Sequence, residues 1–266
     1  MKKITPGIFI LLTLLFGGGC SPVPGTGFWG QQATLRPGWQ QVKSAAVSAA
    51  TDPMTWVPAA GAAIFSFGDL DESTADWADK HRPIFGRDAS NESDSLRAAM
   101  TAAYVITALA APSGDTPGEW SGNKAKGFAV GLVAMGANDW LTLGLKDLTS
   151  RQRPNNRDDK SFPSGHASQS TSRAALAAKN LDYIDLPDWG RTTLKTTFYG
   201  IAAGASWARV EANQHYPSDV LAGFALGHFI GAFVSEAFLN APATGDASVI
   251  LEPAPSGLGL TLSFAF

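Results

Sequence analysis

The sequence predicts a mostly α-helical bundle with a short C-terminal β-hairpin. From about residue 40 to residue 240 the chain is rich in alanine, and its apolar residues recur at helical spacing. The breaks between these stretches contain Pro, Gly and Asp combinations that are typical of helix ends. From Leu258 to Phe266 every second residue is large and apolar, which is the period of a strand with one apolar face.

Eight helices are expected between the breaks, at residues 40–50, 56–67, 72–80, 93–110, 126–150, 165–179, 190–206 and 218–239. The stretch Ser248–Glu252 is expected to pair with the C-terminal strand across Pro253–Gly257, as a hairpin packed on the bundle or at a membrane surface. A terminal Phe266 on an alternating strand is similar to the last strand of an outer-membrane barrel. One hairpin cannot close a barrel, however, because a barrel needs at least about eight strands.

Composition limits the class of protein. A chain of 266 residues is long enough for one domain with a buried core, and its net charge of -3 excludes an ordinary nucleic-acid-binding surface. Residues 127–145 and 220–239 are long and apolar enough to cross a bilayer. The first stretch contains Asn138 and Asp139, and the second contains His228 and Glu236. Polar groups at mid-span are costly in lipid, so a soluble or peripheral bundle is the favoured interpretation.

The N-terminus indicates export. Lys2 and Lys3 precede an apolar run, Ile8–Phe16, and small residues then lead to Cys20, the only cysteine in the chain. This order predicts a signal peptide over residues 1–19. It resembles the signals of bacterial lipoproteins, in which such a cysteine carries the lipid, although Gly17 stands where leucine is usual. The alternative is a plain secretory peptide.

The resemblance to lipoproteins implies a membrane anchor. A single cysteine cannot form an internal disulfide, and a lipid on Cys20 would remove an exposed thiol. By the same resemblance, Ser21 directs the protein to the periplasmic face of the outer membrane rather than to the inner one. Residues 20–39, which are rich in Gly, Pro and Gln, are expected to form a tether.

Three short segments contain the chemically useful residues. In the first, Lys146 and Arg153 lie seven residues apart, so one helix ended by Pro154 would bring them to the same face. In the second, Ser164 is a good N-cap and Gly165 allows an anion to approach the backbone of the helix start. Alone, the first segment indicates a basic helix end, and the second a capped helix with an incidental His166.

The third segment contains Arg209, His215 and Asp219. Pro217 suits the first turn of a helix, so Asp219 could accept a hydrogen bond from one ring nitrogen of His215 and leave the other basic. A surface ion pair is the simpler interpretation of this pair alone. Elsewhere, His228 is expected in the core, His81 in a solvated loop, and the acidic residues 69–72 at an exposed helix start.

Taken together, the three segments resemble the type 2 phosphatidic acid phosphatase superfamily, which includes bacterial nonspecific acid phosphatases and vanadium haloperoxidases. The resemblance covers residues 146–219, from Lys146 through Arg153-Pro154 and Pro163-Ser-Gly-His166 to Arg209, His215 and Asp219. Ala208 departs from it, because serine usually precedes the arginine. The implied fold is the helical bundle of the acid phosphatase and haloperoxidase type, as a phosphatase domain over residues 40–240 with a tail over 241–266.

The resemblance implies a role for each residue. Lys146, Arg153 and Arg209 would bind phosphate oxygens, with backbone N–H groups at Ser164 and Gly165. His215 would attack phosphorus and form a phosphohistidine, Asp219 would orient it, and His166 would protonate the leaving oxygen. No metal or cofactor is expected.

The expected reaction is hydrolysis of a phosphate monoester or pyrophosphate, and the membrane anchor favours a lipid over a small soluble phosphoester. Two alternatives stay open. A vanadium haloperoxidase would hold vanadate in the same pocket. A non-catalytic envelope protein would bind lipid phosphate, and the C-terminal strand is its distinctive support.

Overall fold

The computed structural model describes residues 27–239 and the segments 247–254 and 257–264. Eight α-helices form its body. They are α2 (Trp39–Thr51), α3 (Pro53–Phe65), α4 (Leu70–His81), α5 (Ala89–Ala110), α6 (Pro117–Thr149), α7 (Gly165–Asn180), α8 (Asp188–Glu211) and α9 (Pro217–Phe238). All eight predicted helices are present, and most of their ends differ from the predicted ones. The predicted signal peptide and Cys20 lie outside the described residues.

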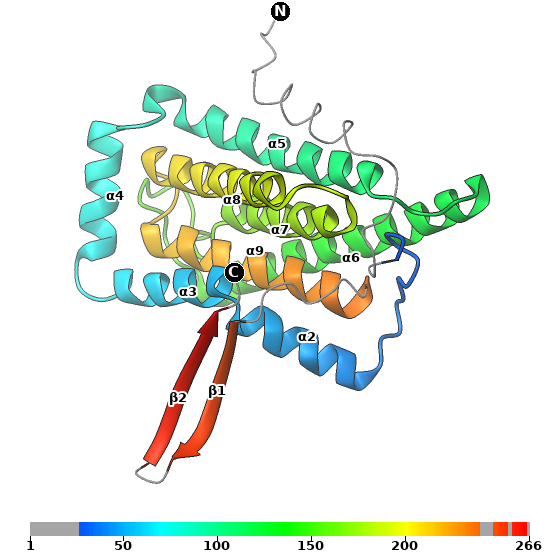
Figure 1. Cartoon of the computed structure of the whole chain (residues 1–266). Helices are drawn as coiled ribbons and strands as arrows, with labels where there is room; N and C mark the ends of the chain where they lie inside the picture. Colours follow the sequence, from blue (N-terminus) through cyan, green and yellow to red (C-terminus); the bar gives the residue numbers. More distant parts are fainter. Residues whose placement is uncertain (1–26, 240–246, 255–256, 265–266) are drawn as a thin grey trace, which may run out of the picture.

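The predicted fold class needs a correction, because the fold is all-α. Within residues 27–239 every regular element is a helix. The segments β1 (Ala247–Ala254) and β2 (Gly257–Phe264) pair with each other antiparallel. They add no layer to the helical domain and project away from it (Figure 1). The alternation of apolar residues was therefore a poor guide to the fold class, which the helices alone determine.

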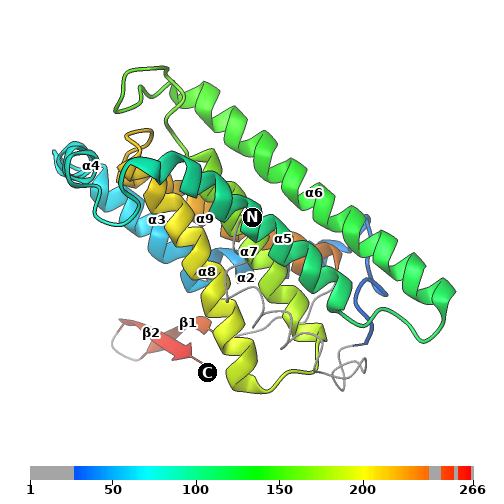
Figure 2. The ribbon, with the colours of Figure 1, turned by 90° about the horizontal axis from the view of Figure 1, so that it is seen from above.

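The helices are arranged around two central ones. Helices α7 and α9 pack along each other, with α5 and α8 on one side and α2 and α3 on the other (Figure 1). Helix α4 crosses one end of the bundle, and the long helix α6 runs along the outside, as the view from above shows (Figure 2). The main core is formed by residues of α5 to α9, including Met100, Leu176, Phe198 and Ile230.

The close approach of α7 and α9 depends on glycines at every fourth position of α9. A Cβ atom at Gly223 would lie 2.5 Å from the Ser164 carbonyl oxygen, and one at Gly227 would lie 2.2 Å from the Ser168 carbonyl oxygen. Since real Cβ atoms do not approach oxygen so closely, these positions require glycine. The contact brings the start of α7 against the start of α9, where two of the three predicted site segments lie.

The predicted tether is wrong over its described part. Trp29 is fully buried, its ring nitrogen donates a 2.8 Å hydrogen bond to Asn180, and its backbone N–H donates to Pro112. Gly127 leaves the space that the Trp29 ring fills, since a Cβ atom there would lie 2.4 Å from the ring. Composition rich in Gly and Pro predicted a tether, but a single large aromatic residue is enough to fix a loop to the core.

Helix α6 begins nine residues before its predicted start. Thr116 and Glu119 form a capping box around Pro117, so Ser121 and Gly122, which precede the predicted start at residue 126, lie inside the helix. Helices α6 and α9 are both long and apolar enough to cross a membrane. In the apolar part of α9, 72% of the residues are buried in the bundle, whereas in that of α6 only 28% are buried, and Trp140 and Leu143 of α6 are exposed.

Candidate active site

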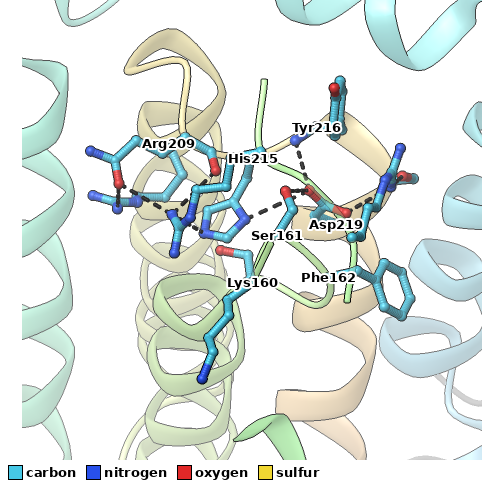
Figure 3. A network of polar contacts seen from close by, with 12 residues as sticks. Lys160, Ser161, Phe162, Arg209, His215, Tyr216 and Asp219 are labelled. Carbon is cyan, nitrogen blue, oxygen red and sulfur yellow. Dashed lines mark hydrogen bonds and ion pairs between the residues drawn. The ribbon is translucent and has the colours of Figure 1, made fainter. Parts of the chain in front are cut away.

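The predicted site residues lie in several parts of the chain that come together. These are the last turn of α6, the loop between α6 and α7, the start of α7, the last turn of α8, the turn after it and the start of α9. Figure 3 shows Arg209, His215 and Asp219 from the last three of these parts. Helix α8 extends to Glu211, so Arg209 lies in its last turn, and Pro217 begins α9 as predicted. A short turn between these helices carries His215, which is 2% exposed.

His215 faces two different surroundings with its two ring nitrogens. Nδ1 lies 3.6 Å from the Asp219 Oδ2 atom, slightly beyond hydrogen-bond distance, with both side chains buried. Nε2 lies 3.4 Å from the Arg153 Nη1 atom. Asp219 is therefore placed to orient the ring, and the Nε2 atom points into a cationic region.

Arg153 and Arg209 are held next to each other by one amide. The Gln214 Oε1 atom accepts a 3.4 Å hydrogen bond from Arg153 and a second, shorter bond from Arg209. Arg153 also forms a 2.6 Å ion pair with Asp158. Arg209 is 6% exposed, and its buried Nε atom has no hydrogen-bond partner within the described residues. The two guanidinium groups thus converge on a position that an oxygen already occupies.

The third cation, Lys146, is buried in the last turn of α6. Its Nζ atom donates a 2.5 Å hydrogen bond to the Lys160 carbonyl oxygen. Burial, with a contribution from Arg153, lowers the pKa of Lys146 to about 8. Burial and Arg153 likewise lower the pKa of Arg209, to about 10.

The predicted helix joining Lys146 to Arg153 is wrong. Helix α6 ends at Thr149, and Ser150 adopts a left-handed conformation with φ of 43°. The chain then forms a loop in which Arg153 N–H donates to the Asp158 carbonyl oxygen and Ser161 N–H donates to that of Arg151. The loop, rather than a helix face, brings Arg153 to the site.

The start of α7 agrees with the predicted cap. Ser164 is its N-cap, and its hydroxyl accepts from the Ala167 N–H. The Ser164 N–H is already donated to the Asp219 carbonyl oxygen, at 2.9 Å. An anion at this helix start would therefore meet the Gly165 N–H rather than that of Ser164.

His166 points toward α5. Its Nε2 atom lies 2.8 Å from the Asp94 Oδ1 atom, and Asp94 also pairs with Arg97. Burial, followed by the charge of Arg209, lowers the pKa of His166, and Asp94 opposes this shift. Asp94 lies 72 residues away in sequence and was not predicted.

The hydrogen-bond partners of Asp219 were not predicted either. Its Oδ1 atom accepts a 2.7 Å bond from Arg151, and its Oδ2 atom accepts from the Ser161 hydroxyl and from the Tyr216 N–H (Figure 3). Arg151 lies two residues before Arg153, within the first of the three segments, so the sequence already placed it near the site. Burial raises the pKa of Asp219, but the nearby His215 ring and the charge of Arg151 lower this pKa by more, so the net shift is downward.

The acidic residues 69–72 were predicted to be exposed at a helix start, but Asp71 is buried. Asp71 is 4% exposed and accepts from Arg151 and Ser218. His228 is a core residue as expected, 3% exposed and 2.8 Å from the Tyr199 hydroxyl. His81 is exposed as expected, but it ends α4 rather than lying in a loop.

The arrangement provides a buried neutral nucleophile beside fixed positive charges. Burial lowers the pKa of His215 to about 4, because Lys146 and Arg153 add to that effect while Asp219 only partly opposes it. At neutral pH the ring is therefore unprotonated on one nitrogen. A tetrahedral anion near Nε2 would be within reach of Arg153 and Arg209 after it replaced the Gln214 oxygen. This geometry suits binding and transfer of a phosphoryl group.

Comparisons with known proteins agree with this geometry. Residues 128–242 match the PAP2 superfamily. Among solved structures, the chain is similar to a transmembrane PAP2-type phosphatidylglycerolphosphate phosphatase from Bacillus subtilis, with a TM-score of 0.52 and 20% identity over 68% of this chain and 92% of that one. This similarity shows a common fold. No curated protein matches the chain. The matched residues 128–242 contain Lys146, Arg153, His166, Arg209, His215 and Asp219, so the similarity to the PAP2 superfamily includes every charged residue that was predicted for the site.

Proposed function

We propose that the protein is a phosphatase of lipid phosphates that works through a phosphohistidine on His215. The observation that carries this proposal is the orientation of the His215 ring. Its Nε2 atom faces Arg153 and its Nδ1 atom faces Asp219, at 3.4 and 3.6 Å. A nucleophilic histidine requires these two surroundings, an anion site at one nitrogen and a carboxylate at the other.

The proposed chemistry has two steps. The His215 Nε2 lone pair attacks phosphorus, the bond from phosphorus to the leaving oxygen breaks, and His166 gives that oxygen a proton. Water then attacks the phosphohistidine, His166 accepts a proton from the water, and inorganic phosphate leaves with His215 neutral again. Lys146, Arg153 and Arg209 balance the charge on the phosphoryl oxygens throughout, and the Gly165 N–H adds a donor at the helix start.

Asp219 has its main effect while His215 is phosphorylated. The phosphorylated ring carries its remaining proton on Nδ1 and bears more positive charge than the free ring. A buried carboxylate 3.6 Å from that atom stabilises this charge. The same carboxylate is fixed by Arg151 and Ser161, so it needs little reorganisation during the reaction.

A lipid substrate is supported by the surface of α6 and by the family. Trp140, Leu143 and Leu148 are 75%, 57% and 83% exposed on this helix. Exposed apolar side chains in such number are typical of surfaces that contact a membrane or another protein. The similar Bacillus subtilis protein is a phosphatidylglycerolphosphate phosphatase. Phosphatidate, a polyprenyl pyrophosphate and a lipid A phosphate are the candidate substrates.

Turnover in the presence of a chelator tests the mechanism. Residues 21–266 would be assayed in excess EDTA at pH 5–7 with p-nitrophenyl phosphate, phosphatidate in mixed micelles and a polyprenyl pyrophosphate. We expect EDTA-resistant release of phosphate that orthovanadate inhibits. His215→Ala should abolish it, whereas His81→Ala, which removes an exposed histidine, should leave it unchanged. A denaturant-quenched reaction with ³²P-labelled substrate should retain label on the wild-type protein.

Each alternative gives a different result. Absence of turnover on all three substrates, with phosphatidate still bound, would favour the non-catalytic lipid-phosphate-binding protein. Halide-dependent peroxidase activity after loading with vanadate would favour the haloperoxidase. Turnover that survives in His215→Ala would contradict the phosphohistidine.

We also propose that a lipid on Cys20 holds the protein at the periplasmic face of the outer membrane, with α6 lying against the lipid. Mass spectrometry of the mature N-terminal peptide should find an acylated Cys20. The variant Cys20→Ala should move from the membrane fraction to the soluble fraction. If it stays in membranes after a carbonate wash, the protein spans the bilayer and the peripheral arrangement is wrong.

A further inference from the structure

A buried carboxylate on α4 is connected to the proposed nucleophile through an arginine. Asp71 lies outside residues 128–242, which match the PAP2 superfamily, and is 4% exposed. Its Oδ1 atom accepts a 2.8 Å bond from the Ser218 N–H. Its Oδ2 atom accepts from the Ser218 hydroxyl and, at 2.8 Å, from Arg151 Nη2.

Arg151 joins this carboxylate to the one that faces His215. Its Nη1 atom donates to Asp219 Oδ1 at 2.7 Å, while Nη2 donates to Asp71. The guanidinium group also lies over the Tyr216 ring, 4.3 Å from its centre. Burial lowers the pKa of Arg151, but the two carboxylates outweigh it and raise the pKa, so the arginine is charged at any working pH. The order of groups from the nucleophile outward is His215, Asp219, Arg151, Asp71.

The charges in this chain explain why a second carboxylate is needed. Arg151 bonds directly to Asp219 and, alone, would cancel its negative charge. A neutral Arg151–Asp219 pair would stabilise a positively charged His215 poorly. With Asp71, the three groups carry a net charge of about −1, which is again available to the ring. Lys146 and Arg153 on the other side of the ring make this negative charge more necessary, because both disfavour a positive His215.

Hydrogen bonds fix α4 and the residues that follow it against the site. Asp79 at its far end accepts from Asn213, in the turn that carries His215. Glu211 accepts from the backbone N–H groups of Ile84 and Phe85, which follow α4, at 3.0 and 2.9 Å. The start of α4 is thus bonded to α9 through Asp71 and Ser218, and its end is bonded to the turn between α8 and α9 through Asp79 and Asn213.

We infer that Asp71 is a positioning residue of the proposed reaction. It holds Arg151 so that Asp219 faces the His215 Nδ1 atom, and it restores the negative charge that Arg151 would otherwise cancel. The inference rests on the proposed function for its kinetic consequence. The arrangement of the four side chains can also be tested without turnover.

The kinetic test uses Asp71→Asn, with Asp76→Asn on the exposed face of α4 as the matched control. We expect kcat to fall about 10- to 100-fold in Asp71→Asn, while KM and inhibition by vanadate change less than about twofold, since phosphate contacts remain. Asp71→Glu keeps the charge and should recover part of kcat. Asp76→Asn should behave as wild type. A wild-type kcat in Asp71→Asn, or an equal loss in Asp71→Glu, would overturn the inference.

A double-mutant cycle separates action through Arg151 from general support of the fold. Arg151→Met leaves two unpaired buried carboxylates, and adding Asp71→Asn removes one of them. The double variant should therefore be at least as active as Arg151→Met alone. If the losses of kcat in the two single variants multiply in the double variant, Asp71 acts independently of Arg151, and the proposed chain of contacts is wrong.

Histidine NMR gives a readout that needs no substrate. The protein has four histidines, and His215→Ala identifies the signals of that ring in long-range ¹H–¹⁵N spectra. In the wild type we expect the proton on Nδ1, facing Asp219, and in Asp71→Asn a shift toward the other tautomer. An unchanged tautomer would overturn the inference even in an active enzyme. An inactive wild type with the expected tautomer change would reject the proposed function and keep the placement of Asp71.

Discussion

The two sides of the His215 ring differ in how their charged groups are held. On the Nε2 side, each cation donates to a group that can be replaced: Lys146 to a backbone carbonyl, Arg153 to Asp158, and Arg209 to Gln214. The Arg153 side chain is 16% exposed and that of Asp158 is 46% exposed. On the Nδ1 side, Asp219 is 0% exposed and both of its oxygens accept bonds from fixed donors.

This difference indicates how the work of the site is divided. The Nε2 side has contacts that a phosphate can exchange, so it is suited to binding and release. On the Nδ1 side, Asp219 is buried and both of its oxygens are hydrogen-bonded. This side is therefore suited to keeping the His215 ring in one orientation while substrate binds and product leaves. Variants of the first side should change substrate binding and leaving-group chemistry. Variants of the second side should change kcat with little effect on KM.

The largest effect on the Nε2 side is expected for His166→Asn with an alkyl phosphate. Without a proton donor the alkoxide leaves slowly, and kcat should fall about 10²- to 10⁴-fold. Nitrophenolate leaves without a proton, so the loss on p-nitrophenyl phosphate should be only a few-fold. Parallel assays of the two esters, with His81→Asn as control, measure the contrast. An equal loss on both esters would remove His166 from the role of general acid.

The sequence was sufficient for the Nε2 side because its residues lie in short segments. The order Lys146, Arg153, His166, Arg209, His215 could be recognised without knowing the path of the chain. The helix that was predicted to bring Arg153 to the site was nevertheless wrong. Nothing in the segment indicated that α6 would end before Ser150, which adopts a left-handed conformation. The order and spacing of the residues therefore identified Arg153 even though the predicted local structure around it was wrong.

The Nδ1 side was only partly predictable. Asp219 follows from its spacing to His215, but Asp71 lies about 150 residues earlier and was interpreted as exposed. An acidic residue at a helix start is usually solvated and favoured by the helix dipole, so this general rule predicted an exposed Asp71. Trp29 was missed for a similar reason, since local composition predicted a tether. Contacts between distant segments decide both positions, and one sequence does not contain that information.

Arg153→Ala should reduce kcat/KM about 10²- to 10³-fold, as expected for the loss of a fixed donor to a charged transition state. Inhibition by vanadate and by phosphate should weaken in the same variant, because Arg153 is on the binding side. Arg157→Ala removes an exposed arginine of the same loop and is the matched control. Steady-state kinetics with inhibition constants give the result. A loss in kcat with unchanged vanadate inhibition would contradict the assignment of Arg153 to phosphate binding.

With p-nitrophenyl phosphate, whose leaving group needs no proton from His166, the pH profile should show one limb from each side of the ring. His215 attacks only when unprotonated, and its pKa is lowered to about 4 by burial, with Lys146 and Arg153 assisting and Asp219 opposing. Activity should thus be retained down to about pH 4 and fall about tenfold per unit below it. Lys146, with a pKa of about 8, loses its charge as pH rises, so KM should increase above that value.

The basic limb can be assigned with Lys146→Arg. A guanidinium group keeps its charge, so KM in this variant should stay flat above pH 8. The acid limb should remain where it was, because the variant does not change the sign of any charge near His215. A basic limb that persists in Lys146→Arg would show that another group titrates there.

The smallest effect is expected for Gln214→Ala. The Gln214 side chain oxygen accepts from both Arg153 and Arg209, so a phosphate oxygen must displace it before both guanidinium groups are available. Its removal should strengthen inhibition by inorganic phosphate about threefold, which corresponds to less than about 1 kcal/mol. Gln152→Ala, which removes an exposed glutamine of the loop that carries Arg153, is the control. Weaker inhibition in Gln214→Ala would mean that the amide keeps the two arginines in place for phosphate, and that the cationic side is as rigid as the carboxylate side.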